Sequence, residues 1–259
     1  MSPVLSVSGY RYYVLFTDDF TRYTWIFPMR NKNEVLTHFQ TFLDRVRNIF
    51  NSTTHYFQSD GGGEYVNNLF TAFCNRMGIH HRLSCPHTPE QNGLAERKHC
   101  HIADMARTLL ATSNAPLNLW VEAVSTAVYL INRLPTPVLQ WASPYFRLFG
   151  QSPSYVDLRT FGCACYPHLG DYVTNKLLPR SVECVFLGYS PHHKGYRCLD
   201  PVTNRVYISR HVRFDELVIP FAHCVQDSPS APTPEYVELD LVPVLPIFVL
   251  QVVPQFQLY

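Results

Sequence analysis

The sequence has no long hydrophobic run and no recognisable targeting segment. No window of the 259 residues contains 18 uninterrupted apolar residues, so we expect no membrane-spanning helix. Residues 1–13 lack the basic stretch and the apolar stretch of a secretory signal. These features predict a protein of the nucleus or the cytoplasm.

Charged residues are also scarce, at 16% of the chain, and the formal net charge is only +1. This balance permits binding to nucleic acid but does not require it, since strongly basic binders have a larger excess. Residues 218–259 contain acidic residues but no Lys or Arg. The chain is 46% hydrophobic and 14% aromatic, which excludes a wholly disordered protein.

The eight cysteines are scattered, and none forms a CxxC pair. A disulfide framework usually occurs in small secreted domains. We therefore expect reduced thiols.

Hydrophobic periodicity divides the first 134 residues into four strands and four helices. The order is strand, strand, helix, strand, helix, strand, helix, helix, which predicts a mixed α/β domain over 1–134. Asn33 and Asn67 are candidate N-caps, and Gly78 is a candidate helix stop. The predicted elements cover residues 10–17, 23–29, 33–49, 55–59, 67–77, 79–83, 94–111 and 118–134.

The pattern changes after a predicted linker at 135–159. Residues 160–217 contain five short strands at close spacing, which predict a small β-barrel. Residues 218–259 are rich in proline and then apolar, and we expect an irregular, disordered tail.

Two acidic residues have the surroundings of metal ligands. Asp60 ends a strand and precedes three glycines, whereas Glu96 lies in the first turn of a helix, with 35 residues between them. Carboxylates are the ligands that Mg²⁺ prefers, and two such ions can assist in-line phosphoryl transfer. Alternatively, Asp60 is an ordinary turn residue and Glu96 is a partner of the helix dipole.

Several segments together resemble the integrase of copia-type LTR retrotransposons. FQSDGGGEY, GIHHRLSCPHTPEQNGLAERKHCHI, LWVEAVSTAVYLINRLP and the hairpin at 12–35 resemble its catalytic core. The segment at 160–216 resembles the SH3-like domain that follows this core. The resemblance covers about residues 3–217. It implies a ribonuclease-H-like core, an SH3-like barrel, and a catalytic trio of two aspartates and one glutamate.

Asp60 and Glu96 match the second and third members of that trio. The first aspartate of the family lies on the first, central strand of the sheet, and no Asp precedes Asp18 in this chain. We therefore expect an N-terminally truncated core with an incomplete two-ion site for Mg²⁺ or Mn²⁺. The activity implied is metal-dependent cleavage and strand transfer of DNA, impaired here unless Asp18 or Asp19 replaces the first aspartate. The alternatives are a non-catalytic remnant that binds nucleic acid or intact integrase, and a fragment without function.

The resemblance also implies the binding partners. These are the ends of the element and the target DNA, with a possible homo-oligomer. The loop of Gln91, Asn92 and Gly93 would touch DNA at the active site. The basic residues that follow Glu96 suit phosphate contacts, although they could equally form a solvated helix face; they are Arg97, Lys98 and His101.

Overall fold

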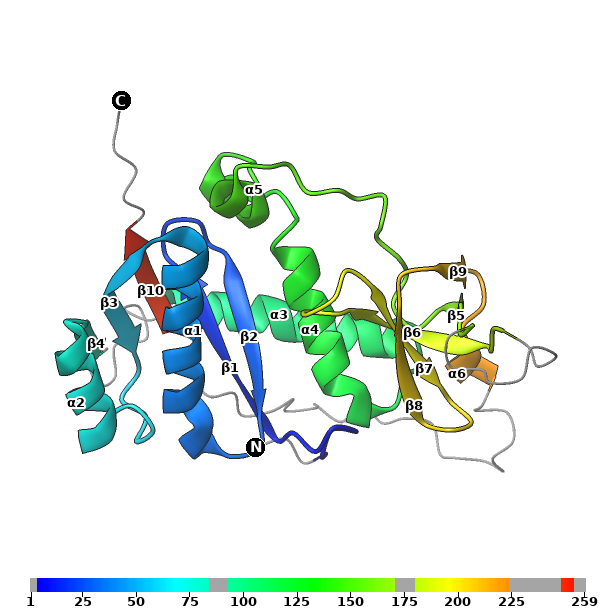
Figure 1. Cartoon of the computed structure of the whole chain (residues 1–259), viewed down its shortest axis with the longest axis horizontal. Helices are drawn as coiled ribbons and strands as arrows, with labels where there is room; N and C mark the ends of the chain where they lie inside the picture. Colours follow the sequence, from blue (N-terminus) through cyan, green and yellow to red (C-terminus); the bar gives the residue numbers. More distant parts are fainter. Residues whose placement is uncertain (1–3, 84–92, 171–179, 224–247, 254–259) are drawn as a thin grey trace. The chain divides into compact units, whose positions relative to one another are not determined.

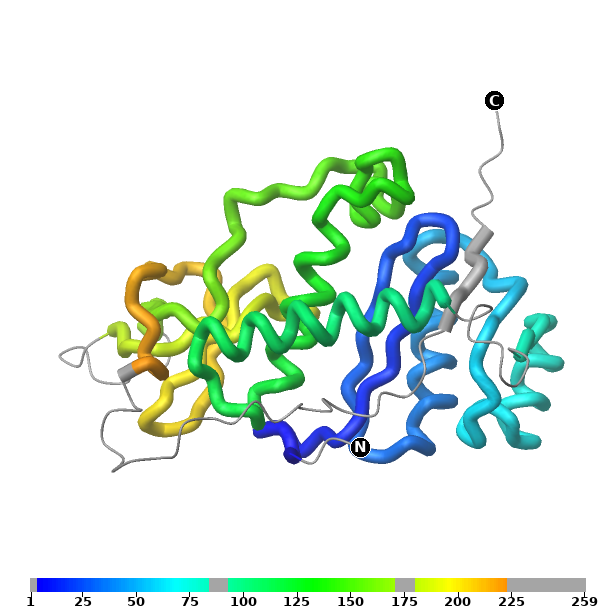
Figure 2. The backbone as a smooth tube through the Cα atoms, turned by 180° about the vertical axis from the view of Figure 1, so that it is seen from behind, coloured from blue at the N-terminus to red at the C-terminus, as the bar shows by residue number. Residues whose placement is uncertain are grey.

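The computed structural model describes residues 4–83, 93–170, 180–223 and 248–253. Figure 1 and Figure 2 show the chain from opposite sides. Gln91 and Asn92 lie outside the described residues. None of the helices in the described part is long and apolar enough to cross a membrane.

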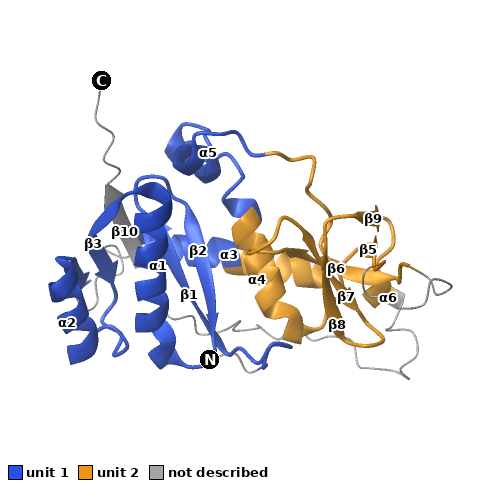
Figure 3. Ribbon diagram, viewed as in Figure 1, with its two compact units in different colours: residues 1–102, 130–153, 240–259 blue, residues 103–129, 154–239 orange. Residues whose placement is uncertain are grey.

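The chain divides into two compact units, each with its own sheet (Figure 3). Unit 1 consists of residues 1–102, 130–153 and 240–259, and unit 2 consists of 103–129 and 154–239. The units group segments that lie together in space. Their limits therefore differ in kind from the predicted domain limits at 134 and 160, which follow the order of the sequence.

Unit 1 is built on a five-stranded sheet in the order β2-β1-β10-β3-β4. The first two strands form the predicted antiparallel hairpin, in which Tyr12 is opposite Met29 and Thr17 is opposite Thr24. The strands are β1 (Tyr12–Asp18), β2 (Thr24–Met29), β3 (Thr53–Ser59), β4 (His80–Leu83) and β10 (Phe248–Val253).

The central strand comes from the end of the chain. β10 runs parallel to β1 and antiparallel to β3, so that Leu250 is opposite Asp18 on one side and Phe57 on the other. The prediction of an irregular tail over 218–259 did not anticipate this strand. Prolines interrupt the apolar run there and obscure its strand signal.

The two faces of β1 contact different helices because successive side chains of a strand point to opposite faces. Val14 and Phe16 belong to an aromatic core that includes Phe39 of α1 (Val35–Phe50) and Phe70 of α2 (Asn68–Met77). On the opposite face, the Tyr13 ring lies 6.4 Å from the ring of His99, which belongs to α3 (Gly93–Thr112). The sheet is therefore covered on both faces (Figure 1).

Helix caps explain where the first two helices begin. Asn67 accepts a hydrogen bond from the Phe70 N–H at 2.9 Å, and Gly78 ends α2 with a φ of 67°, as predicted. Asn31 rather than Asn33 begins the first helical segment. Its N–H donates to the Glu34 carboxylate at 2.9 Å, and a short 3-10 helix precedes α1.

The predicted linker at 135–159 contains structure of its own. After α4 (Trp120–Ile131) comes the short helix α5 (Pro144–Phe149). Asn132 joins this region to β2: its Oδ1 accepts from the Thr24 N–H at 2.9 Å, and its Nδ2 donates to the Thr24 carbonyl at 2.7 Å. These two bonds satisfy the backbone of Thr24 on the outer edge of the sheet, where β2 has no neighbouring strand, and they join Asn132 to unit 1.

Unit 2 contains the five predicted strands as an antiparallel sheet in the order β8-β7-β6-β5-β9. The first of these strands begins later than predicted, because Gly162 has a φ of 81° and the backbone turns there, just before the strand. The strands are β5 (Ala164–Pro167), β6 (Cys184–Tyr189), β7 (Tyr196–Asp200), β8 (Arg205–Ser209) and β9 (Val212–Asp215).

The core of this sheet is rich in sulfur. Phe186 packs among four buried cysteines with free thiols, namely Cys163, Cys165, Cys184 and Cys198. Burial raises the pKa of Cys163 and of Cys184 to about 12. These thiols therefore stay protonated and act as small apolar side chains.

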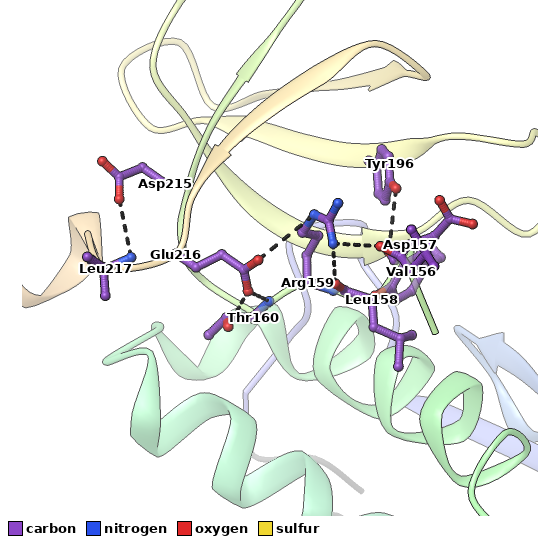
Figure 4. A network of polar contacts seen from close by, with 10 residues as sticks. Val156, Asp157, Leu158, Arg159, Thr160, Tyr196, Asp215, Glu216 and Leu217 are labelled. Atoms are coloured by element: carbon purple, nitrogen blue, oxygen red, sulfur yellow. Dashed lines mark hydrogen bonds and ion pairs between the residues drawn. The ribbon is translucent and has the colours of Figure 1, made fainter. Parts of the chain in front are cut away.

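A polar network joins the segment that enters β5 to the end of β9 (Figure 4). Arg159 donates to the carbonyls of Val156 and Leu158 at 2.8 and 2.6 Å. Glu216 accepts from the N–H and the hydroxyl of Thr160 at 2.8 and 2.6 Å. The Thr160 hydroxyl is the main reason why the pKa of Glu216 is lowered.

Candidate functional site

Asp60 follows β3 directly and turns into the glycine-rich segment of residues 61–63. Its Oδ1 accepts a hydrogen bond from the Gly62 N–H at 3.1 Å. Burial raises the pKa of Asp60, partly offset by that hydrogen bond, and Glu64 raises it further. A half-buried carboxylate at the end of a strand is thus positioned by its own turn.

Glu64 approaches Asp60 across Gly62. A Cβ atom at residue 62 would lie 3.1 Å from both Asp60 Oδ1 and Glu64 Oε1. Glycine therefore leaves space for two carboxylates to converge above the backbone. Their mutual repulsion is consistent with the raised pKa of Asp60.

Glu96 lies in the first turn of α3 and is exposed. The sheet-facing side of this helix carries the fully buried Ala95 and Ile102, together with His99. Gly93, the described residue of the predicted loop, is the first residue of the helix.

The basic residues of α3 lie on other sides of the helix than Glu96. They follow it by one, two and five positions, and because each helical residue turns by about 100°, they lie roughly 100–200° around the helix from it. Arg97, Lys98 and His101 thereby form one group on the side that also carries Leu94. The structure brings these three predicted residues together but separates them in direction from Glu96.

This group lines a cavity of about 350 Å³ within unit 1. The other walls come from the β1–β2 turn, represented by Arg22, and from residues 131–138. Burial and the neighbouring Arg22 guanidinium lower the pKa of Lys98 to about 8.

Sequence reasoning missed Arg22. It belongs to the turn that Asp18 and Asp19 open, and its backbone has a φ of 61°. With this backbone conformation, the side chain of Arg22 lines the cavity together with residues of α3. Arg22 lies about 75 residues before those residues in the sequence. The only sequence signal was a basic residue in a short polar turn.

Asp18 and Asp19 are both engaged in that same turn. Asp18 Oδ2 accepts from the Thr21 N–H and hydroxyl at 2.8 and 2.6 Å, and Asp19 pairs with Arg22. In the register of the sheet, Asp18 is level with Phe57, three residues before Asp60. Three residues of strand correspond to roughly 10 Å, and β10 lies between the two strands.

The described residues do not supply a complete metal site. No group of three His, Cys, Asp or Glu side chains among residues 4–83, 93–170 and 180–223 is arranged to hold a metal ion. The strands on either side of β3 are β10, with the sequence FVLQVV, and β4, with the sequence HHRL. Neither strand contains a carboxylate.

Two family models match the chain. Residues 3–89 match the integrase core domain, and residues 163–227 match the retroviral polymerase SH3-like domain. The matches cover the sheet of β1 to β4 and the antiparallel sheet of unit 2. The chain therefore contains an α/β integrase core followed by an SH3-like domain.

Curated relatives identify the particular group. The Retrovirus-related Pol polyproteins from transposons RE1 and RE2 of Arabidopsis thaliana are 52% and 50% identical over 222 and 221 residues, or 86% and 85% of this chain. The corresponding polyprotein from transposon TNT 1-94 of Nicotiana tabacum is 37% identical over 82% of it. The chain belongs to the copia-type retrotransposon Pol polyproteins, as their region of integrase core and SH3-like domain. It spans about 15% of the length of RE1 and RE2.

The solved structures that match the chain are more distant. The HTLV-2 integrase catalytic core domain in complex with magnesium is 18% identical, with a TM-score of 0.39, over 51% of this chain and 80% of that one. The intasome of simian T-cell lymphotropic virus in complex with a PP2A regulatory subunit is 14% identical, with a TM-score of 0.42, over 83% and 80%.

Proposed function

We propose that this chain is an integrase-type DNA-binding protein whose polynucleotidyl transferase activity is impaired. The observation that carries the proposal is the 52% identity with a retrotransposon Pol polyprotein over 86% of the chain. The reaction class is cleavage of a phosphodiester and its transfer to target DNA. Its substrates are the ends of the element and the target duplex, and we propose that the protein acts as an oligomer on them.

Asp60 and Glu96 are the proposed catalytic carboxylates. Their oxygens are suitable donors for Mg²⁺ or Mn²⁺, and two such ions would stabilise the attacking and leaving oxygens of the reaction. The residues present do not complete that site, because the two strands beside β3 contain no carboxylate. Asp18 and Asp19 are poor replacements, since both stabilise the β1–β2 turn. This is our reason for proposing impairment.

The second candidate function is non-catalytic binding of nucleic acid or of intact integrase. The incomplete carboxylate set favours it, because binding requires cations and apolar surface rather than a metal site. Gly93 with the neighbouring Gln91 and Asn92, and the basic side of α3, are the proposed DNA contacts. The proposed domain limits are the core at 1–134, a connection at 135–159, the SH3-like domain at 160–217 and a tail at 218–259, with β10 returning from that tail to the core sheet.

The test is strand transfer and 3′-end nicking of a labelled duplex in Mg²⁺ or Mn²⁺. The full chain is compared with Glu96→Gln and with the control Asp104→Asn, which changes an exposed acid on the same helix. We expect no measurable activity in any of the three, together with duplex binding by a folded chain. Activity that Glu96→Gln abolishes and Asp104→Asn retains would refute impairment and support the transferase. A folded chain that neither reacts nor binds duplex would refute both the transferase and the binding of nucleic acid, and would leave association with intact integrase as the candidate function.

A further inference from the structure

The cavity beside α3 has a composition that neither catalysis nor folding explains. The residues that the structure describes around it include three cationic side chains, Arg22, Arg97 and Lys98, together with His101, and no carboxylate. The rest of the lining is almost entirely apolar, with Leu134 and Pro135 among it. Arg97 and His101 are exposed, whereas Arg22 and Lys98 are partly buried. A folded protein normally pairs partly buried cations with acids, so the closeness of Arg22 and Lys98 is costly unless an anion binds there.

Charge compensation within the cavity is incomplete. Asp19 pairs with Arg22 at the turn. Lys98 is half-buried beside Arg22, and the described part of the chain provides it with no ion pair. Arg22 and Lys98 both line the cavity, and no acid is among its described lining residues, so the lining itself carries a net positive charge. An anionic group placed between Arg22 and Lys98 would neutralise it.

The size of the cavity and its apolar wall further restrict the class of ligand that would fit. A cavity of about 350 Å³ lies within the range of small-molecule sites, roughly 300–1,000 Å³. A bare inorganic anion would leave the apolar side of the cavity without contacts. An anion that carries a flat apolar body would use both sides, with its charge on the cations and its body against Leu134 and Pro135.

We propose that this cavity binds a single nucleotide unit, with its phosphate between Arg22 and Lys98 and its base against the wall of residues 131–138. The site is separate from the side of α3 that carries Glu96. The inference deepens the proposed nucleic-acid binding and rests on it for the source of the nucleotide, which is an unpaired nucleotide at a DNA end. A free mononucleotide has the same chemistry and is the alternative source.

The first experiment measures binding of dTMP to the full chain by calorimetry, with deoxythymidine and inorganic phosphate as matched ligands. We expect dTMP to bind at least tenfold more tightly than either, because each lacks half of the contacts. Lys98→Met removes the charge and keeps the length of the side chain. Arg22→Asn removes the charge and keeps a residue that tolerates a positive φ.

Each of these variants is expected to weaken dTMP binding about tenfold or more. The control Arg107→Met is expected to leave binding unchanged, because Arg107 is an exposed cation on the same helix outside the cavity. Thermal melting of each variant shows whether it is folded. If folded Lys98→Met and Arg22→Asn both bind dTMP as tightly as the unmodified chain, the proposal is wrong.

The second experiment separates the two sources and the two proposals. Binding to a duplex with a single-stranded 5′ overhang is compared with binding to its blunt counterpart, for the full chain and Lys98→Met. An overhang preference that Lys98→Met removes supports an unpaired nucleotide of DNA as the ligand. If the chain binds dTMP but shows no preference for the overhang duplex, the ligand of the cavity is a free mononucleotide, and a DNA end as its source is refuted. Duplex binding without dTMP binding or overhang preference refutes the cavity site and leaves the proposed function intact.

Discussion

Because β10 lies at the centre of its sheet, we predict that a proline in this strand destabilises unit 1. Leu250 is paired on both sides, with Asp18 and with Phe57. In Leu250→Pro the backbone loses its N–H and the proline ring obstructs the neighbouring strand. A carbonyl left buried without a donor costs about 1–3 kcal/mol, and the distortion of the strand adds to this cost.

The assay is amide hydrogen exchange in β1 and β3, together with urea unfolding. The control is Leu250→Val, which keeps the N–H and favours the strand conformation. We expect Leu250→Pro to increase exchange at Thr53–Ser59 by tenfold or more relative to this control, because the inner edge of β3 loses its partner. Equal exchange in the two variants would show that the tail does not form the centre of the sheet in solution.

Three further variants test individual contacts. Asn132→Leu leaves the buried N–H and C=O of Thr24 without partners, which should lower the free energy of unfolding by about 2–5 kcal/mol in urea titrations. Gly188→Ala should cost about 3 kcal/mol or more in thermal melts, because φ is 112° and the new Cβ would lie 2.2 Å from the hydroxyl of a buried α4 threonine. Arg197→Met removes the 3.1 Å ion pair with the buried Glu122 and should cost about 3–5 kcal/mol at pH 7. Burial already raises the pKa of Glu122 and Arg197 lowers it, so the variant raises this pKa further. The variant should therefore keep its stability below the pKa that Glu122 has in the unfolded state, and lose it as the pH rises through the raised pKa of the folded state. A loss of unfolding free energy that is equal at pH 4.5 and pH 7 would contradict this reasoning.

Features that depend on near neighbours in the chain were predicted well. The hairpin of β1 and β2, the Asn67 cap and the Gly78 stop follow from side-chain alternation and turn chemistry within a few residues. The five strands of unit 2 follow from the same local signals. Such signals specify which elements form because each uses its own hydrogen bonds and its own apolar face.

Features that join distant segments could not be predicted in this way. Nothing in FVLQVV indicates that it pairs with β1 and β3, which lie about 190–240 residues earlier. Arg22 reaches the cavity through a left-handed backbone conformation that its residue type rarely adopts. The capping role of Asn132 toward Thr24 likewise depends on a partner 108 residues away.

The candidate carboxylates and the cationic cavity illustrate how one helix can separate two chemistries. The interval between Asp60 and Glu96 concerns only distance along the chain, whereas the direction of each side chain depends on its angle around α3. Ala95 and Ile102 bury one side of the helix against unit 1, and this fixes the rotation of all the others. Glu96 is then left exposed on one flank, while Lys98 and Arg97 line the cavity. A substitution that changed only the packing of Ala95 or Ile102 would therefore alter both the exposure of Glu96 and the shape of the cavity.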